Sequence, residues 1–86
     1  MKFAQAIEAV LDGSYIRREG DETIQKIFLV NGSQFQVNRA PLNVIFAEGT
    51  VVNYRPHVDC IYSDGTVGVW TPSQLDLFAT DWIIVE

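Results

Sequence analysis

The sequence predicts an α+β domain: a small antiparallel sheet that carries an N-terminal helix and a short helix near the C-terminus. Apolar residues recur at helical spacing at the start of the chain, and two runs of strand-like sequence are interrupted by Asn-Gly and Asp-Gly pairs, which are typical of hairpin turns. The 86 residues are 48 % hydrophobic, which fits one domain over residues 1–86 with a small core. A chain this short favours self-association, so we expect a homo-oligomer.

The first segment is predicted to be an amphipathic helix. Gly13 can cap its C-terminal end, and Tyr15–Arg18 is a short strand candidate followed by the polar turn EGDE. Four apolar residues of the helix follow helical spacing: Phe3, Ile7, Val10 and Leu11.

The first predicted hairpin pairs residues 27–30 with residues 35–38. Between them, Asn31 and Gly32 favour a tight type I′ turn, because both central residues of such a turn have positive φ. The segment 39–50 has no clear period and is predicted to be a loop with one helical turn. Its apolar residues must pack on the sheet or on a neighbouring subunit: Leu42, Val44, Ile45 and Phe46.

The second predicted hairpin joins residues 51–62 to residues 66–70 around Asp64 and Gly65. Thr71 is then expected to be the N-cap of a short helix, with Gln74 closing a capping box. The stretch DWIIVE is predicted to be a last strand. Three residues of the short helix should face inward: Leu75, Phe78 and Ala79.

Charge and composition exclude several classes of function. The formal charge of -5 and the pI near 4.6 argue against binding of polymeric nucleic acid or of an anionic membrane, because both need a cationic surface. The single cysteine, Cys60, excludes an internal disulfide, and we expect neither a zinc site nor a cofactor. The start lacks the apolar run of a signal peptide, and no stretch is long enough to span a bilayer, so we expect an intracellular protein.

The most unusual stretch is NYRPHVDC, residues 53–60. If it is a regular strand, Tyr54 and Cys60 lie on one face, and a two-residue turn places Trp70 opposite Asp59 on the other. Pro56 lacks an N–H and requires an edge, a bulge or a bend, and a bulge would invert half of this assignment. The face that carries Trp70 would hold a row of polar residues: Asn53, Arg55, His57 and Asp59.

This row has two interpretations. Arginine can bind phosphate, Asn and Asp can bind ribose or base edges, and an aromatic ring can stack on a base, so the row can hold a nucleotide. Periodicity alone favours a solvated face, Trp70 is of a type more typical of a core, and Arg39 and Arg55 can pair with surface acids. No nucleophile is tied by sequence to His57 and Asp59, so we do not expect an enzyme.

Nearly the whole chain resembles a phage protein family. The stretches that carry the resemblance are MKFAQAIEAVLDG, FLVNGSQFQVNRAPL, EGTVVNYRPHVD and DGTVGVWTPSQLDLFATDWIIVE. In this order and spacing they resemble the second type of Thoeris anti-defence protein, small sponges that phages use against bacterial immunity. One departure is Asp21, which stands where the family usually has a tryptophan in a GWNG-like turn, and it affects the expected ligand preference more than the fold.

The resemblance implies sequestration without chemistry in the cytoplasm of the infected bacterial host. Members of the family form homotetramers that trap glycocyclic ADP-ribose in pockets between subunits, and some hold cyclic dinucleotides in separate pockets. A protein-binding inhibitor of a defence effector and an enzyme that cleaves the signal are the alternatives. The expected ligand-binding residues are Phe28, Asn38, Arg39, Asn53, Tyr54, Arg55, His57, Asp59, Trp70, Ser73 and Gln74.

Overall fold

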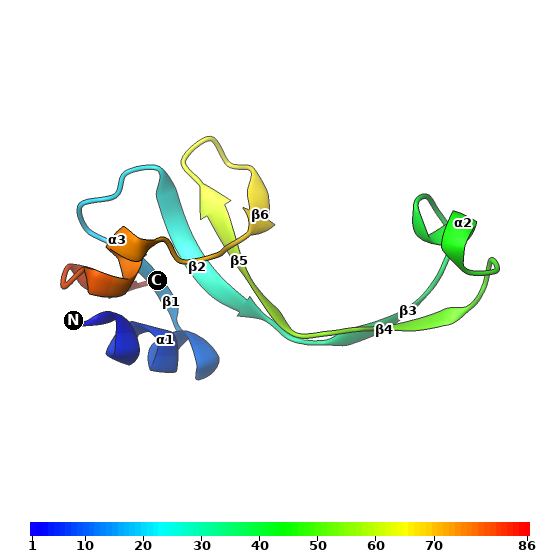
Figure 1. The fold of residues 1–86 in the computed structure, drawn as a ribbon, viewed down its shortest axis with the longest axis horizontal. Coiled ribbons are helices and arrows are strands. Elements are labelled where there is room, and N and C mark those ends of the chain that lie inside the picture. Colours follow the sequence, from blue (N-terminus) through cyan, green and yellow to red (C-terminus); the bar gives the residue numbers. More distant parts are fainter.

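The computed structural model of residues 1–86 consists of a body and a long arm, residues 31–56 (Figure 1). The body contains a five-stranded antiparallel sheet and two helices, and the arm is a two-stranded ribbon with a short helix at its far end. The longest extent is 47 Å and the other two are 26 and 25 Å. The predicted α+β class is confirmed. No helix combines the length and the apolar character needed to cross a membrane.

The sheet of the body has the strand order β6-β5-β2-β1-β7 and is antiparallel throughout. The predicted first helix, first strand and last strand are confirmed as α1, β1 and β7. The elements of the body are α1 (Phe3–Leu11), β1 (Tyr15–Arg18), β2 (Ile24–Val30), β5 (His57–Tyr62), β6 (Val67–Val69), α3 (Gln74–Phe78) and β7 (Trp82–Val85).

One face of this sheet packs against α1 and forms the core. The indole of Trp82 meets that of Trp70 edge to face, with ring centroids 6.0 Å apart, and its Nε1 donates to the carbonyl oxygen of Asp76 at 3.0 Å. Cys60 is fully buried here and packs as a small apolar residue of the core. The buried residues of this core are Ala6, Val10, Ile16, Ile27, Cys60, Trp70 and Trp82.

Arg18 joins the C-terminal part of the chain to β1. Its Nε donates to Oδ1 of Asp81 at 3.0 Å, and its Nη1 donates to Oδ1 of Asp76 at 3.3 Å. The other carboxylate oxygen of Asp81 accepts from the N–H of Gly20 at 2.9 Å. The guanidinium of Arg18, followed by this backbone N–H, lowers the pKa of Asp81 below its ordinary value of 3.8.

The arm continues the β2–β5 pair beyond the body. Its strands are β3 (Ser33–Gln36) and β4 (Val51–Tyr54), and the tip, residues 37–50, joins them. The tip contains α2 (Leu42–Ile45), which confirms the predicted helical turn, and α2 lies at the end of the molecule farthest from α1 and α3 (Figure 1).

The predicted tight turn at Asn31 and Gly32 is wrong. β2 pairs with β5 and β3 pairs with β4, so these two residues lie at the junction between body and arm, and neither has positive φ. A Cβ at Gly32 would lie 2.9 Å from the carbonyl oxygen of Tyr54 and 3.3 Å from Cδ of Pro56. The glycine therefore permits close approach of two chain segments instead of reversing the chain.

The second predicted hairpin is confirmed only for residues 57–62 and 67–69, because residues 51–54 pair with β3. Its register is wrong by one residue. The N–H of Tyr62 donates to the carbonyl oxygen of Thr66 at 2.8 Å, so the turn has three residues, and its glycine has a φ of 87°. Asp59 is paired with Val69 instead of Trp70. Trp70 consequently falls in the core, only 9 % exposed, and not on the polar face.

The helix α3 begins two residues later than predicted. Ser73 is its N-cap: the side-chain oxygen accepts from the N–H of Asp76 at 3.2 Å, and the N–H of Ser73 donates to the Asp76 carboxylate at 2.8 Å. Leu75 and Phe78 are 76 % and 82 % exposed, so the prediction that they face inward is wrong. Ala79 packs against the core as predicted.

Candidate ligand-binding site on the arm

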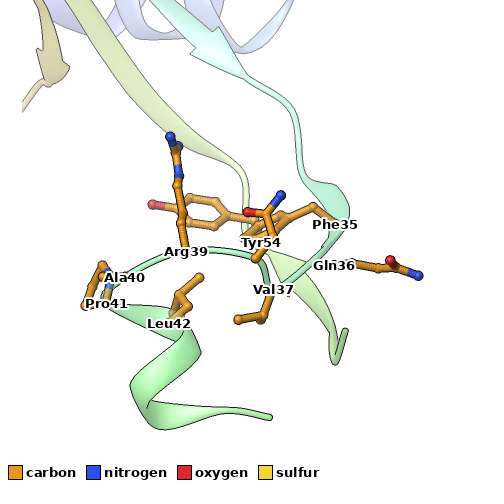
Figure 2. Close-up of a pocket in the computed structure, with 9 residues that line it drawn as sticks. Phe35, Gln36, Val37, Arg39, Ala40, Pro41, Leu42 and Tyr54 are labelled. Carbon is orange, nitrogen blue, oxygen red and sulfur yellow. The ribbon is translucent and has the colours of Figure 1, made fainter. Parts of the chain in front are cut away.

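A cavity of about 770 Å³, here called the arm cavity, lies where β3 enters the tip (Figure 2). Its volume is in the range of small-molecule binding pockets. Three of the predicted ligand-binding residues line it, namely Asn38, Arg39 and Tyr54. Its full lining is Phe35, Gln36, Val37, Asn38, Arg39, Ala40, Pro41, Leu42 and Tyr54.

Hydrogen bonds at the tip fix the backbone around this cavity. Val37 is buried, its N–H donates to the carbonyl oxygen of Thr50 at 2.9 Å, and its own carbonyl oxygen accepts from the N–H of Gly49 at 2.9 Å. The carbonyl oxygen of Arg39 accepts from the N–H of Asn43 at 3.1 Å, which ties the arginine to α2. The side chain of Arg39 is thus presented by a hydrogen-bonded loop.

An arginine and two aromatic rings characterise the arm cavity. The rings of Phe35 and Tyr54 are tilted by 41° with centroids 6.2 Å apart. Figure 2 shows Arg39 and Tyr54 on the same side of the arm backbone, whereas Gln36 points away from them. Arg39 forms no ion pair in the chain, so its guanidinium is available to an anion.

Pro56 breaks the alternation that the sequence predicted for residues 53–60. The rings of Tyr54 and His57 lie edge to face, with centroids 5.3 Å apart, although they were predicted on opposite faces. Strand parity within β4 places Asn53 on the other side of the arm from Tyr54. The predicted row that contained Asn53 is therefore wrong, and Tyr54 takes its place beside His57. Arg55 is exposed at the bend between the two strands.

The other two residues of the predicted polar row, His57 and Asp59, lie beside each other. Nε2 of His57 lies 3.4 Å from Oδ1 of Asp59, and Nδ1 of the same ring lies 3.1 Å from the carbonyl oxygen of Arg55. A ring that donates from Nδ1 to this carbonyl can donate to Asp59 as well only when it is doubly protonated. Oδ1 of Asp59 is buried and has no hydrogen-bond donor. A buried carboxylate oxygen without a hydrogen bond is unusual, and a donor from another molecule could satisfy it.

Asp59 lies on the sheet face opposite α1, here called the open face. Residues of this face belong to four strands and include Tyr15, Arg17, Lys26, Phe28, His57, Asp59, Ile61, Val67 and Val69. The predicted site residue Phe28 lies here, opposite Asp59 in the ladder, and its ring meets that of Tyr15 edge to face at 6.2 Å between centroids. A second cavity of about 260 Å³ is lined by Tyr15, Lys26, Phe28 and Ile61.

Asn53, Arg55, His57 and Asp59 line neither cavity. Three further predicted site residues lie on other parts of the body. Trp70 is buried in the core and offers little surface for stacking on a ligand. Ser73 and Gln74 lie at the start of α3, where the carboxylate of Asp76 already accepts from the first backbone N–H. A negative charge in this position disfavours an anion, so we leave these three residues out of the proposed site.

Sequence reasoning missed several residues that line the cavities. Phe35 was assigned to a hairpin strand, and only its pairing with β4 shows that it lies beside Tyr54. Tyr15 and Lys26 join Phe28 because Ile16 pairs with Ile27, a register that no local signal specifies. Nζ of Lys26 lies 5.0 Å from the centroid of the Tyr15 ring, a cation–π distance.

The chain is a small α+β protein whose arm cavity is lined by one arginine, aromatic rings and apolar side chains. The family described as the Thoeris anti-defense 2-like domain (Tad2-like) matches residues 1–85, and the chain belongs to this family. Comparison with curated proteins gives no match. Family membership supports a role in anti-defence against Thoeris, and this family is not known as a family of enzymes.

Proposed function

We propose that this protein is a non-enzymatic sponge for cyclic nucleotide signals of bacterial immunity in the cytoplasm of the infected host. Glycocyclic ADP-ribose is its main ligand, and cyclic dinucleotides are a second class. The observation that carries the proposal is the arm cavity, which is lined by the unpaired Arg39 and by the rings of Phe35 and Tyr54.

The chemistry of the lining fits a cyclic ADP-ribose. The guanidinium of Arg39 can donate two parallel hydrogen bonds to a phosphate, and such charge-assisted pairs are among the strongest hydrogen bonds in proteins. Phe35 and Tyr54 offer π-faces to an adenine base, and stacking of this kind contributes about 1–3 kcal/mol per base. The side-chain amide of Asn38 supplies both a donor and an acceptor for ribose hydroxyls or base edges.

The same lining supports binding without reaction. Arg39 and Tyr54 are the only ionisable side chains in it, and it contains no carboxylate, imidazole or thiol. Hydrolysis or isomerisation of a pyrophosphate or glycosidic bond needs a general base, a nucleophile or a metal to lower the barrier. A ligand held in this cavity would therefore be released intact.

A sponge also needs high affinity, which favours an oligomer. Nanomolar binding corresponds to about -12 kcal/mol, and ligands held this tightly are usually enclosed on most sides. The arm cavity is bounded only by residues 35–42 and by Tyr54, so a second chain is needed to close it. The homotetramer implied by the family resemblance would provide this closure.

Ligand retention and release test the proposal. The purified protein is incubated with glycocyclic ADP-ribose, freed of unbound ligand by gel filtration and heat-denatured, and the supernatant is analysed by chromatography and mass spectrometry. We expect intact ligand in stoichiometric amounts. Cleaved ligand in the supernatant would overturn the proposal in favour of an enzyme.

Two further measurements complete this test. A parallel incubation with cyclic dinucleotides examines the second ligand class. Failure to retain any of these ligands, combined with co-purification of a defence effector, would replace the sponge with a protein-binding inhibitor, because an inhibitor of that kind leaves the concentration of free signal unchanged.

A further inference from the structure

We propose that the arm of one chain packs on the open face of a second copy, and that the second copy's arm packs on the open face of the first. This reciprocal contact rests on the proposed function in one respect only: it assumes that the oligomer is the form that binds the ligand. The evidence for it comes from surface area, exposed apolar residues, charge and an unpartnered carboxylate within the single chain.

The chain has more surface than a monomer of its mass. Its accessible surface is 6160 Å², whereas a folded monomer of 9.7 kDa is expected to have about 5,100 Å². The radius of gyration is 15.8 Å, against about 12 Å for a compact domain of this length. The excess of about 1,000 Å² is close to the area of roughly 800 Å² that each partner contributes to a standard interface.

The tip of the arm accounts for part of this excess. Val44, Ile45 and Phe46 are 84 %, 69 % and 43 % exposed, and Val37 is the only buried residue of the arm. The arm extends away from the body, so these side chains cannot reach the sheet of their own chain (Figure 1). Of the two packing partners that the sequence allowed for them, only the neighbouring subunit is left.

The open face is the second uncovered apolar surface. α1 and α3 lie on the other side of the sheet, and on this side Val67 and Val69 of the edge strand β6 are 60 % and 67 % exposed. Tyr15 is 44 % exposed beside the half-buried Phe28. A reciprocal contact between two copies covers both tips and both open faces at once.

The charges favour contact between arm and body over contact between two bodies or two arms. The arm carries Arg39, Arg55 and Glu48, a net charge of 2 − 1 = +1, and the remaining residues carry 4 cationic and 10 acidic side chains, a net charge of −6. Two bodies of charge −6 repel each other, and two arms of charge +1 gain nothing. The arm of one chain meets a body of opposite sign in the other.

Asp59 supplies an independent indication on the open face. Its buried Oδ1 forms no hydrogen bond within the chain, where Nε2 of His57 is its polar neighbour at 3.4 Å. The guanidinium groups of both arm arginines form no ion pair within the chain. A donor supplied by the arm of the second copy would satisfy this oxygen. The arrangement also brings the arm cavity toward the cavity around Lys26 and Tyr15 of the second copy. Lys26 would then add a second cation for a diphosphate that Arg39 contacts from the arm.

Disulfide trapping between differently tagged chains tests the contact without ligand. One chain carries Ile45→Cys and the other Val69→Cys, both with Cys60→Ala, and the mixture is oxidised mildly. We expect a heterodisulfide between the two chains. The matched control replaces Val69→Cys with Leu75→Cys, which changes a similarly exposed residue on α3, and should give at most a trace of heterodisulfide. Equal yields from the two pairs, or trapping of Ile45→Cys chains only with each other, would overturn the arm-to-body contact.

Sedimentation velocity provides the second test. The unmodified protein should sediment as an assembly, and Val44→Asp with Ile45→Asp should reduce its mass at least twofold. The control, Leu75→Asp with Phe78→Asp, changes residues of similar exposure on α3 and should leave the mass unchanged. A circular dichroism spectrum with unchanged shape shows that the body is still folded, as expected because Val44 and Ile45 are exposed.

The outcomes separate this contact from the proposed function. A monomeric unmodified protein, or an assembly that survives the tip substitutions, contradicts the contact whether or not glycocyclic ADP-ribose is retained. Lys26→Ala should leave the assembly intact and weaken retention of glycocyclic ADP-ribose at least fivefold. An assembly with normal trapping that retains no ligand would contradict the sponge and leave the contact standing.

Discussion

The rings of Tyr54 and His57 meet edge to face, with centroids 5.3 Å apart, across the proline that separates arm from body. Tyr54 also meets Phe35, at 6.2 Å, so one ring connects the arm cavity to the polar groups of the open face. Because Pro56 cannot donate to a strand ladder, the chain bends here, and the bend brings Tyr54 and His57 to the same side.

Tyr54→Ala should weaken retention of glycocyclic ADP-ribose roughly tenfold, the equivalent of about 1.4 kcal/mol and the lower part of the range for base stacking. Tyr54→Phe keeps the ring and should retain ligand nearly as the unmodified protein does. Isothermal titration calorimetry measures both variants. Tyr62→Ala removes a tyrosine of the body outside both cavities and serves as the matched control. A loss of affinity in Tyr62→Ala as large as in Tyr54→Ala would assign the effect to general destabilisation.

Local sequence signals predicted the elements of the body better than the connections between them. The helical spacing from Phe3 to Leu11 and the Asp-Gly turn act over a few residues, and both elements are present. The pairing of β2 with β5 joins segments about thirty residues apart, and it overrides the local preference of Asn31 and Gly32 for a tight turn. A two-stranded arm was therefore not predicted. The sequence did show that the predicted loop contains apolar residues that need a packing partner, and that residues 53–60 are an unusual stretch.

Only part of the candidate site was predicted, again because local signals do not specify how distant segments pair. Asn38, Arg39 and Tyr54 were selected by residue type and resemblance, and the arm brings them together. Trp70 was misplaced by a one-residue error in the hairpin register, because an Asp-Gly pair is compatible with both two-residue and three-residue turns. A single-residue slip moves every side chain of a strand to the other face.

Arg39→Ala should reduce the affinity for glycocyclic ADP-ribose roughly ten- to hundredfold, because hydrogen bonds to charged groups contribute about 1.5–3 kcal/mol. Arg39→Lys retains the charge but not the forked geometry and should have intermediate affinity. Lys2→Ala, the control, removes a cation from an exposed position that lines neither the arm cavity nor the cavity at Tyr15. Calorimetry at two salt concentrations should also show a weaker salt dependence for Arg39→Ala. Unchanged affinity in this variant would remove the arm cavity from the proposed site.

Gly32→Ala should destabilise the junction between body and arm. The added Cβ would lie 2.9 Å from the carbonyl oxygen of Tyr54, closer than carbon and oxygen can approach, and the backbone must shift. Overpacking of this kind costs about 1–3 kcal/mol. Hydrogen exchange by mass spectrometry should show faster exchange in β3 and β4, with β1 and β7 unchanged. Gln34→Ala, at an exposed position of the arm, is the control, and equal protection of the arm in both variants would contradict the prediction.

Acid should destabilise the body through Asp81. The pKa of its carboxyl is lowered in the folded protein, chiefly by Arg18, so the unfolded chain binds a proton at a higher pH than the folded chain does. The stabilisation is complete above the ordinary value of 3.8 and is lost as the pH falls through the lower, folded pKa. Asp21 and Asp64 act in the same direction, because hydrogen bonds from Thr23 and Thr66 lower their pKa values.

Arg18→Gln removes the main cause of the Asp81 shift. This variant should be less stable at neutral pH and should lose less stability than the unmodified protein between about pH 5 and pH 3, a range that brackets the ordinary carboxyl pKa of 3.8. Urea unfolding at a series of pH values, followed by the fluorescence of Trp70 and Trp82, measures the difference. Arg17→Gln is the matched control, because Arg17 is the neighbouring arginine and forms no ion pair in the chain. Parallel pH profiles for Arg18→Gln and the unmodified protein would show that the Arg18–Asp81 pair does not set the acid sensitivity of the fold.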